Sequence, residues 1–76
     1  MRLTILAFAQ ARDRLGFQQQ EVEYAEGETP RQIMERVAPG QNWSHIRVAV
    51  DCEYVEWDSP LKSARELALI PPVSGG

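Results

Sequence analysis

The sequence carries one clear helix signature, and segments of alternating apolar residues stand on both sides of it. Thr29 is a good N-cap, Pro30 suits the first helical position, and Gln32 completes a capping-box pattern. Apolar residues then recur at helical spacing, at Ile33, Met34 and Val37. Pro39-Gly40 ends the segment. We therefore predict one amphipathic helix between two groups of strands.

Period-two alternation, which is typical of strands, occurs in three segments, at residues 2–9, 18–25 and 46–52. Residues 66–70 form a last apolar strand, which Pro71-Pro72 ends. A turn at 51–54 separates the third segment from a short return strand that contains Val55 and Trp57. Residues 11–16 predict one helical turn that ends at Gly16.

The predicted order is therefore strand, strand, helix, strand, short strand, strand. A single helix laid over one face of a mixed sheet satisfies this order. We predict an α+β fold of the ubiquitin-like β-grasp class, with one main helix packed on one face of a mixed sheet. In this interpretation residues 1–70 form the β-grasp domain, and residues 71–76 form an extended C-terminal tail that ends in Gly-Gly.

The chain length of 76 residues allows one domain with a thin core. A complete catalytic apparatus is hard to fit into so small a core, which favours a carrier, a binding module or a subunit. The formal net charge of −3 argues against nucleic-acid binding. The chain has one cysteine, so no intrachain disulfide can form. It has no long apolar run, so we expect a cytoplasmic protein without a membrane partner.

The most informative segment is the tail, Pro71-Pro72-Val73-Ser74-Gly75-Gly76. Its prolines favour extended backbone, so we expect the tail to project away from the sheet. Six extended residues reach about 20 Å, which is enough to enter the active site of another protein. The useful group at the tip is the carboxylate of Gly76, which could be activated as an acyl-adenylate and converted to a thiocarboxylate. Two terminal glycines alone would also fit a frayed end or a cloning remnant.

The tail resembles the terminus of the small subunit of molybdopterin synthase. The segment Leu6–Gly16 resembles the opening strand and turn of that family. Val48–Val50 and Leu61 fit the family's third strand and the loop before its last strand. The resemblance spans essentially the whole chain and implies a β-grasp fold.

The resemblance also implies a sulfur-carrier function centred on Gly76. An ATP-dependent adenylating enzyme would activate this residue, and a sulfur donor would convert it to a thiocarboxylate. The sulfur would then pass to precursor Z, the cyclic pyranopterin monophosphate, in the biosynthesis of molybdopterin and the molybdenum cofactor. In that family the catalytic pocket belongs mainly to the large subunit, in a heterotetramer of two small and two large subunits.

The chain is thus expected to donate sulfur as a subunit and not to be an enzyme on its own. It would bind no cofactor and no metal, and ATP would be used by the activating enzyme. The residues expected to enter the partner's active site ahead of Gly76 are Pro71, Pro72, Val73, Ser74 and Gly75.

The sequence departs from that family's pattern at two places. Asp51 stands where the family often has Asn, and Ala64-Arg65 stands where it usually has Gly-Asp. The loss of the glycine predicts a different turn, a helical one through Pro60–Ala64. Both departures bear on the surface that partners meet.

Phe8 is the candidate partner contact outside the tail. Alternation places Leu3, Ile5 and Ala7 on one face of the first strand and Leu6 and Phe8 on the other. If the helix covers the first face, Phe8 lies on an open face and marks a protein contact. The alternative is a twisted strand with Phe8 tucked under residues 11–16.

Other reactive residues favour structural interpretations. Cys52 lies on the apolar side of its predicted strand, which indicates a buried or half-buried thiol. His45 has no second ligand near it, so it predicts no metal site. Trp43 is predicted to lie in the core or over it. The acidic residues Asp51, Glu53, Glu56 and Asp58 look like a solvated face.

Three other functions stay open at this point. The chain could carry sulfur for thiamine or another thio-cofactor pathway. It could be a ubiquitin-like protein modifier that forms an isopeptide bond through Gly76. It could also be a plain binding module whose tail is incidental.

Overall fold

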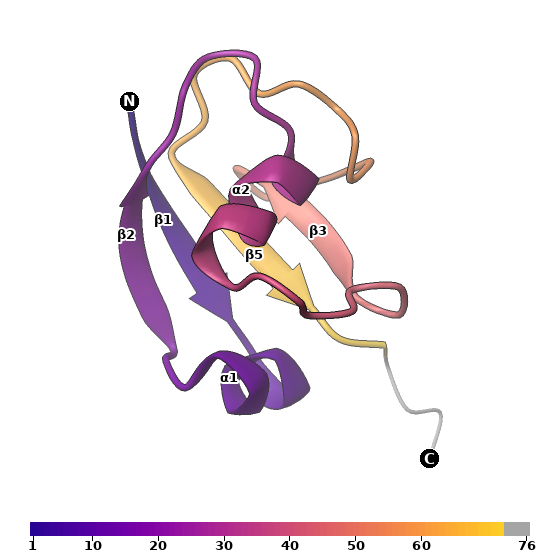
Figure 1. Ribbon diagram of the computed structural model, residues 1–76. Helices are drawn as coiled ribbons and strands as arrows, with labels where there is room; N and C mark the ends of the chain where they lie inside the picture. Colours follow the sequence, from indigo (N-terminus) through magenta and orange to yellow (C-terminus); the bar gives the residue numbers. More distant parts are fainter. Residues whose placement is uncertain (73–76) are drawn as a thin grey trace.

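The computed structural model describes residues 1–72 and shows five strands and two helices (Figure 1). In chain order the elements are β1 (Arg2–Ala7), α1 (Ala9–Leu15), β2 (Gln19–Glu23), α2 (Pro30–Val37), β3 (Arg47–Val50), β4 (Glu53–Val55) and β5 (Glu66–Ile70). The predicted α+β order is confirmed. The predicted helical turn near residue 11 is a seven-residue helix, and Gly16 ends it in the left-handed conformation at φ 78°. No helix within residues 1–72 is long and apolar enough to cross a membrane.

The strands form one mixed sheet in the order β2-β1-β5-β3-β4. Strands β1 and β5 are parallel, whereas the other neighbours are antiparallel. Because β1 and β5 run the same way, α1 and the chain after Ile70 leave the sheet at the same end (Figure 1). The central strand β5 therefore leads directly into the tail.

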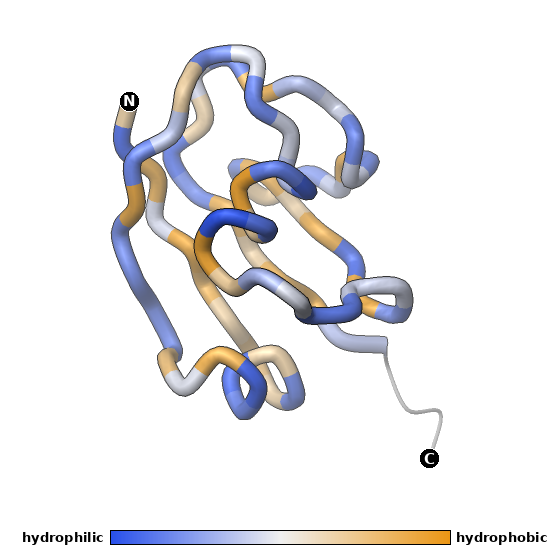
Figure 2. Tube along the Cα trace, in the orientation of Figure 1, coloured by the Kyte–Doolittle hydropathy of each residue, from blue (hydrophilic) through white to orange (hydrophobic). Residues whose placement is uncertain are grey.

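Helix α2 packs on one face of this sheet, as predicted. Ile33 and Met34 of α2 are fully buried. They meet the inward residues of the strands, which include Leu3, Ile5, Val48, Leu67 and Leu69. Figure 2 shows hydrophobic residues along β1, β3 and β5, the strands that face α2. The capping box is also confirmed, because Gln32 N donates to Thr29 Oγ1 at 3.2 Å and Thr29 N donates to Gln32 Oε1 at 3.0 Å.

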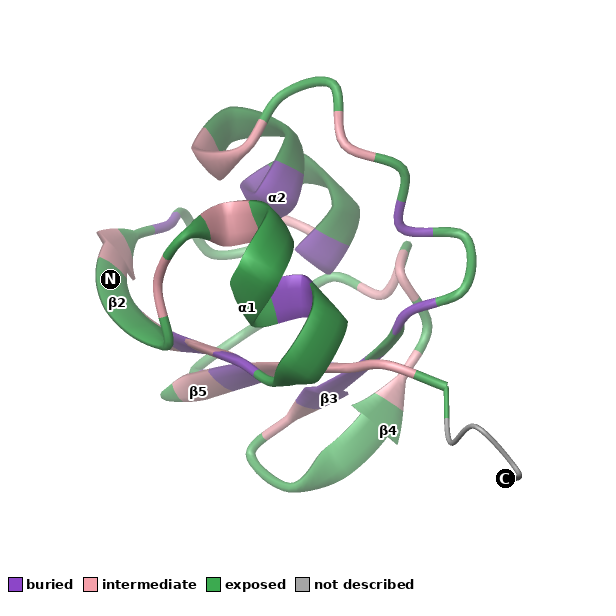
Figure 3. Cartoon of the chain, turned by 90° about the horizontal axis from the view of Figure 1, so that it is seen from below, coloured by how far each residue is buried: buried purple, intermediate pink, exposed green. Residues whose placement is uncertain are grey.

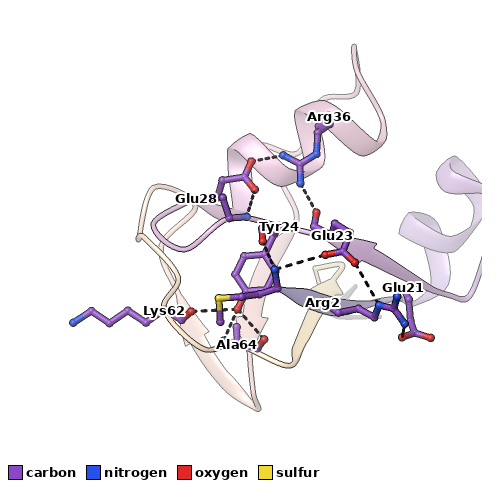
Figure 4. Close-up of polar contacts among 10 residues, drawn as sticks. Arg2, Glu21, Glu23, Tyr24, Glu28, Arg36, Lys62 and Ala64 are labelled. Atoms are coloured by element: carbon purple, nitrogen blue, oxygen red, sulfur yellow. Dashed lines mark hydrogen bonds and ion pairs between the residues drawn. The ribbon is translucent and has the colours of Figure 1, made fainter.

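The end of the sheet opposite the tail is held by Tyr24 (Figure 4). Its buried hydroxyl donates to Ala64 O at 2.9 Å and accepts from Ala64 N at 2.8 Å. Leu61 N donates to Glu28 O at 2.9 Å, and Gly27 N donates to Leu61 O at 2.7 Å. The predicted helical turn through residues 60–64 is wrong, because these backbone groups bond to distant partners and not to each other along the segment.

The β3–β4 hairpin also differs from the prediction. The strand predicted at 46–52 ends at Val50, and the return strand starts at Glu53. Asp51 and Cys52 form the loop with φ of 49° and 71°, the geometry that matches the twist of a tight hairpin. Asp51 Oδ1 accepts from the backbone N–H groups of Arg65 and Glu66 at 3.1 and 3.0 Å. This contact holds the turn, so Cys52 is exposed and the predicted burial of its thiol is wrong.

Two tryptophans close the core beside β3. Trp43 is 8% exposed, which confirms the predicted core position. It stacks on Trp57 with ring centroids 6.2 Å apart. Trp57 lies beyond the end of β4, and its Nε1 donates to Ile46 O at 2.9 Å. The indole thus ties the chain after β4 back to the segment that leads into β3.

Candidate functional site

The tail leaves the molecule at the end of β5. Ile70 pairs with Arg47 of β3, Pro71 is half-buried against the domain, and Pro72 is exposed. Val73, Ser74, Gly75 and Gly76 lie outside the described residues. The predicted projection of the tail into a partner, and the role of Gly76, therefore stay predictions.

The face of the sheet that α2 does not cover carries apolar side chains beside the start of the tail. Figure 3 shows both helices on one side of the sheet and none on the other. Strand registers place Leu6 beside Ala68, Ala68 beside Ala49, and Ala49 beside Tyr54. We call this surface the open-face patch and define it by Leu6, Phe8, Ala49, Tyr54, Ala68 and Ile70.

Phe8 lies exposed on this patch. Its side chain is 48% exposed, so the alternative in which it is tucked under residues 11–16 is wrong. The reason is its extended backbone at φ −119°, which continues the alternation of β1. Ala11 N donates to Phe8 O at 3.0 Å, so the backbone of Phe8 starts α1 while its ring faces outward. A contact between this ring and a partner stays a prediction.

A shallow hollow joins the patch to the tail. Its lining includes His45, Arg47, Tyr54, Ile70, Pro71 and Pro72. The guanidinium carbon of Arg47 lies 5.2 Å from the ring centroid of Tyr54, a cation–π distance that holds both side chains on this surface. His45 is an exposed turn residue. Within residues 1–72 no group of three or more potential ligands is arranged to hold a metal ion.

The perturbed carboxylates belong to the helix side of the molecule. The hydrogen bond from Arg36 holds the pKa of Glu28 below its ordinary value. The hydrogen bond from Arg31, 2.8 Å from Asp58 Oδ1, likewise lowers the pKa of Asp58. Asp58 is exposed, so this member of the acidic cluster is solvated, as predicted. Neither ion pair belongs to the open-face patch, which offers contact surface and no paired acid and base.

Tyr54 and Arg47 are site residues that sequence reasoning missed. The prediction grouped the residues around Tyr54 with an acidic turn because it started the return strand at Val55. Starting that strand at Glu53 would have placed Tyr54 on the same face as Ala49. The alternation of β4 thus contained the signal for Tyr54. Reading that signal required the correct length of the β3–β4 loop, which decides where the return strand starts.

The sequence model of the ThiS family matches residues 5–76. A Pyrococcus furiosus protein described as molybdopterin converting factor, subunit 1, has 26% identity and a TM-score of 0.75, over 96% of this chain and 99% of that one. SAMP1 from Haloferax volcanii has 24% identity and a TM-score of 0.78 over the full length of both chains. A second structure, of the H. volcanii small archaeal modifier protein 1, has 20% identity and a TM-score of 0.75, over 95% and 98% of the two chains. These likenesses confirm the predicted ubiquitin-like β-grasp class.

Proposed function

The chain belongs to the ThiS family of ubiquitin-like sulfur carriers, and from that premise we propose that Gly76 carries sulfur as a C-terminal thiocarboxylate. One observation carries the proposal, the family match that runs through Gly76 itself. It is consistent with the fold, in which the central strand β5 leads into Pro71 and Pro72 beside the open-face patch. A domain of this form presents its own chain end to the active site of another protein.

The proposed chemistry has two steps. An ATP-dependent adenylating enzyme joins the Gly76 carboxylate to AMP and releases pyrophosphate. Hydrosulfide delivered by the sulfur donor then attacks the acyl carbon, AMP leaves with the electrons of the broken C–O bond, and loss of the proton on sulfur gives the thiocarboxylate. This chain supplies the acyl group and the docking surface, while its partners supply the catalytic residues.

The open-face patch is proposed to contact these partners. Phe8 and Tyr54 are 48% and 63% exposed, and both lie near the start of the tail. A partner that covers them buries apolar surface and fixes the direction in which the tail leaves the domain. Pro71 and Pro72 restrict the backbone at the point of departure, so less conformational freedom is lost when the tail enters a channel.

We propose molybdopterin biosynthesis as the pathway. The resemblance of the tail to the molybdopterin synthase small subunit supports it, as does the name of the P. furiosus neighbour. In this proposal a large subunit takes the thiocarboxylated chain, in an assembly of two small and two large subunits, and sulfur passes to precursor Z.

The decisive measurement is the intact mass of the chain after incubation with ATP, the adenylating enzyme and a sulfur donor. We expect a gain of about 16 Da, from the replacement of one oxygen by sulfur. A chain without Gly76 is the control and should not gain mass. An unchanged mass with a competent enzyme would refute the sulfur-carrier proposal.

The pathway is tested by adding the product of that reaction to a large subunit with precursor Z. Formation of molybdopterin with loss of the 16 Da would support the proposal. A sulfur carrier for thiamine or another thio-cofactor would gain the mass but would not release sulfur to precursor Z.

The modifier function is the second candidate, and the name of the Haloferax volcanii neighbour, small archaeal modifier protein 1, favours it. Lys62 is the single lysine of the chain. Self-linked chains could therefore form only through Lys62 or the amino group of Met1. High-mass conjugates in a cell extract that require Gly76 would support this function, and a Lys62→Arg variant would identify the linkage.

A further inference from the structure

Two primary amines of the chain stand in different surroundings. The amino group of Met1 donates to Tyr24 O at 2.9 Å and lies 3.6 Å from Glu23 Oε2. The other amine is the ε-amine of Lys62, the single lysine. An amine that is held by a carbonyl and a carboxylate must give up both contacts before it can act as a nucleophile. These surroundings therefore favour Lys62 as the reactive amine.

Lys62 presents its amine from an anchored loop. Its neighbours Leu61 and Ala64 are 4% and 6% exposed, and Lys62 O accepts from Tyr24 Oη at 3.3 Å. The side chain itself is exposed and extends away from the cluster around Tyr24 (Figure 4). The backbone thus holds the base of the side chain in place while its tip stays in solvent.

The ε-amine also has free space beside it. A hollow of about 420 Å³ lies next to Lys62. Residues of the β3–β4 hairpin line the other side of this hollow, namely Val50, Asp51, Glu53 and Val55. Neither of the two carboxylates pairs with the ε-amine, which forms no ion pair within residues 1–72. The amine is therefore open to approach by a second protein chain.

Lys62 and the tail stand at opposite ends of the molecule (Figure 1). Lys62 precedes β5 and Pro71 follows it, so the five residues of the central strand lie between them. A strand of this length spans about 16 Å. The open-face patch reaches the tail end at Phe8 and Ile70. A partner that covers Phe8 and takes the tail therefore leaves Lys62 uncovered at the far end.

We propose that Lys62 is the acceptor for an isopeptide bond to Gly76 of a second copy of this chain. The inference rests on the proposed function and deepens its modifier candidate, because it needs the adenylated Gly76. The neutral ε-amine of the acceptor copy attacks the acyl carbon, a C–N bond forms, and the C–O bond to AMP breaks. AMP leaves with the electrons of that bond, and one proton of the amine passes to water. The step needs no oxidant or reductant, because ATP has already activated the carboxylate.

The linked product keeps two useful ends. The donor copy is joined through its tail, whereas the acceptor copy keeps its own Gly76 and its open-face patch available. A bond that uses two different surfaces of the same chain builds an open polymer and not a closed dimer. The same adenylate also reacts with hydrosulfide, so the supply of sulfur decides between the thiocarboxylate and the isopeptide.

The test separates the donor from the acceptor. The donor chain carries Lys62→Arg and keeps its tail, so it can be adenylated but offers no lysine. The acceptor chain keeps Lys62 and lacks Gly76. Two control acceptors, also without Gly76, carry Lys62→Arg alone or Lys62→Arg with Arg12→Lys, which moves the single lysine to an exposed position of α1. Each pair is incubated with ATP and the adenylating enzyme without a sulfur donor, and melting temperatures confirm that every variant folds.

We expect one linked product, with the summed mass of both chains less about 18 Da for the water lost. Because trypsin does not cut after a linked lysine, the digest should contain Glu66–Gly76 of the donor joined to Val48–Arg65 of the acceptor. The acceptor with Lys62→Arg alone should lose this product. The acceptor with the moved lysine should form a linked product about tenfold more slowly, because its amine lies at the end where partners dock.

Three outcomes would overturn the proposal, namely linkage through the amino group of Met1, equal rates for the two lysine positions, or no linked product. A parallel sample of the donor with the sulfur donor separates these outcomes from the function on which the proposal rests. If the donor gains about 16 Da there while no linked product forms without sulfur, self-linkage is refuted and the carrier function stands. If it gains no mass, the carrier function itself is refuted. Conjugates of the Lys62→Arg chain with other proteins would leave the modifier function standing without self-linkage.

Discussion

Replacing Tyr24 by phenylalanine should destabilise the fold by removing a single oxygen atom. The Tyr24 hydroxyl donates to Ala64 O at 2.9 Å and accepts from Ala64 N at 2.8 Å. A longer contact reaches Lys62 O at 3.3 Å. The tyrosine is 4% exposed and Ala64 is 6% exposed, so water cannot replace the hydroxyl without movement of the loop before β5.

The magnitude follows from the groups left without partners. A buried polar group that loses its hydrogen bond costs about 1–3 kcal/mol, and both the N–H and the C=O of Ala64 lose theirs. The exposed loop can shift and admit water, so each group should cost an amount near the lower end of that range. We therefore expect the free energy of unfolding to fall by about 2–3 kcal/mol in total. In a domain of this size, 1 kcal/mol corresponds to about 4–8 °C, so the melting temperature should fall by roughly 10–20 °C.

Urea and thermal unfolding, followed by circular dichroism, measure this loss. Tyr54→Phe is the matched control, because Tyr54 is 63% exposed and its hydroxyl makes no hydrogen bond within residues 1–72. A Tyr24→Phe melting temperature within about 2 °C of that control would refute the reasoning, since it would correspond to less than about 0.5 kcal/mol. Well below the melting temperature, sulfur loading of the variant should be normal, because Tyr24 lies at the end of the sheet opposite the tail.

Three further changes test the site, the helix cap and the pH dependence. Phe8→Asp should weaken partner binding at least tenfold with little change in stability, whereas Ser63→Asp, away from the patch, should leave binding unchanged; titration of the labelled chain with the adenylating enzyme measures both. Thr29→Ala should lower the unfolding free energy by about 1 kcal/mol through loss of the N-cap, and no change in urea unfolding would contradict that role. Glu28→Gln should lower the unfolding free energy by about 0.2–1 kcal/mol at pH 7, the range for exposed ion pairs. Because Arg36 lowers the folded-state pKa of Glu28, the pair stabilises above the ordinary value of 4.5 and this contribution is lost as the pH falls through the lowered pKa. The unfolding free energies of the wild-type protein and of Glu28→Gln should therefore converge in acid. A difference that stays constant with pH would exclude the ion pair as its source.

The features that were predicted correctly depend on short-range patterns. Alternation in β1 identified the buried Leu3, Ile5 and Ala7, because successive strand residues point to opposite faces. The capping box at Thr29 could be predicted because both of its hydrogen bonds join residues three apart. From these elements the order of strands and the position of α2 on one face followed, since few packings satisfy one helix and several half-apolar strands.

The features that were missed depend on contacts between distant residues. Asp51 accepts hydrogen bonds from Arg65 and Glu66, and this long-range contact holds the positive φ that a propensity argument disfavours for residues other than glycine. The strand therefore stops at Val50, and Cys52 points to solvent. The loop after Pro60 fails to form the predicted helical turn for the same kind of reason, because Tyr24 and Glu28 occupy its backbone groups.

The candidate site could be predicted from the sequence only in part. Alternation alone left two positions open for Phe8, and the choice between them depends on where β1 ends and how α1 begins. The position of Phe8 near the tail depends on a third fact, the parallel pairing of β1 with β5, which no local pattern contains. A sequence can thus identify the chain end as a candidate site, but the open-face patch beside it forms only once residues about 60 positions apart share one end of a sheet.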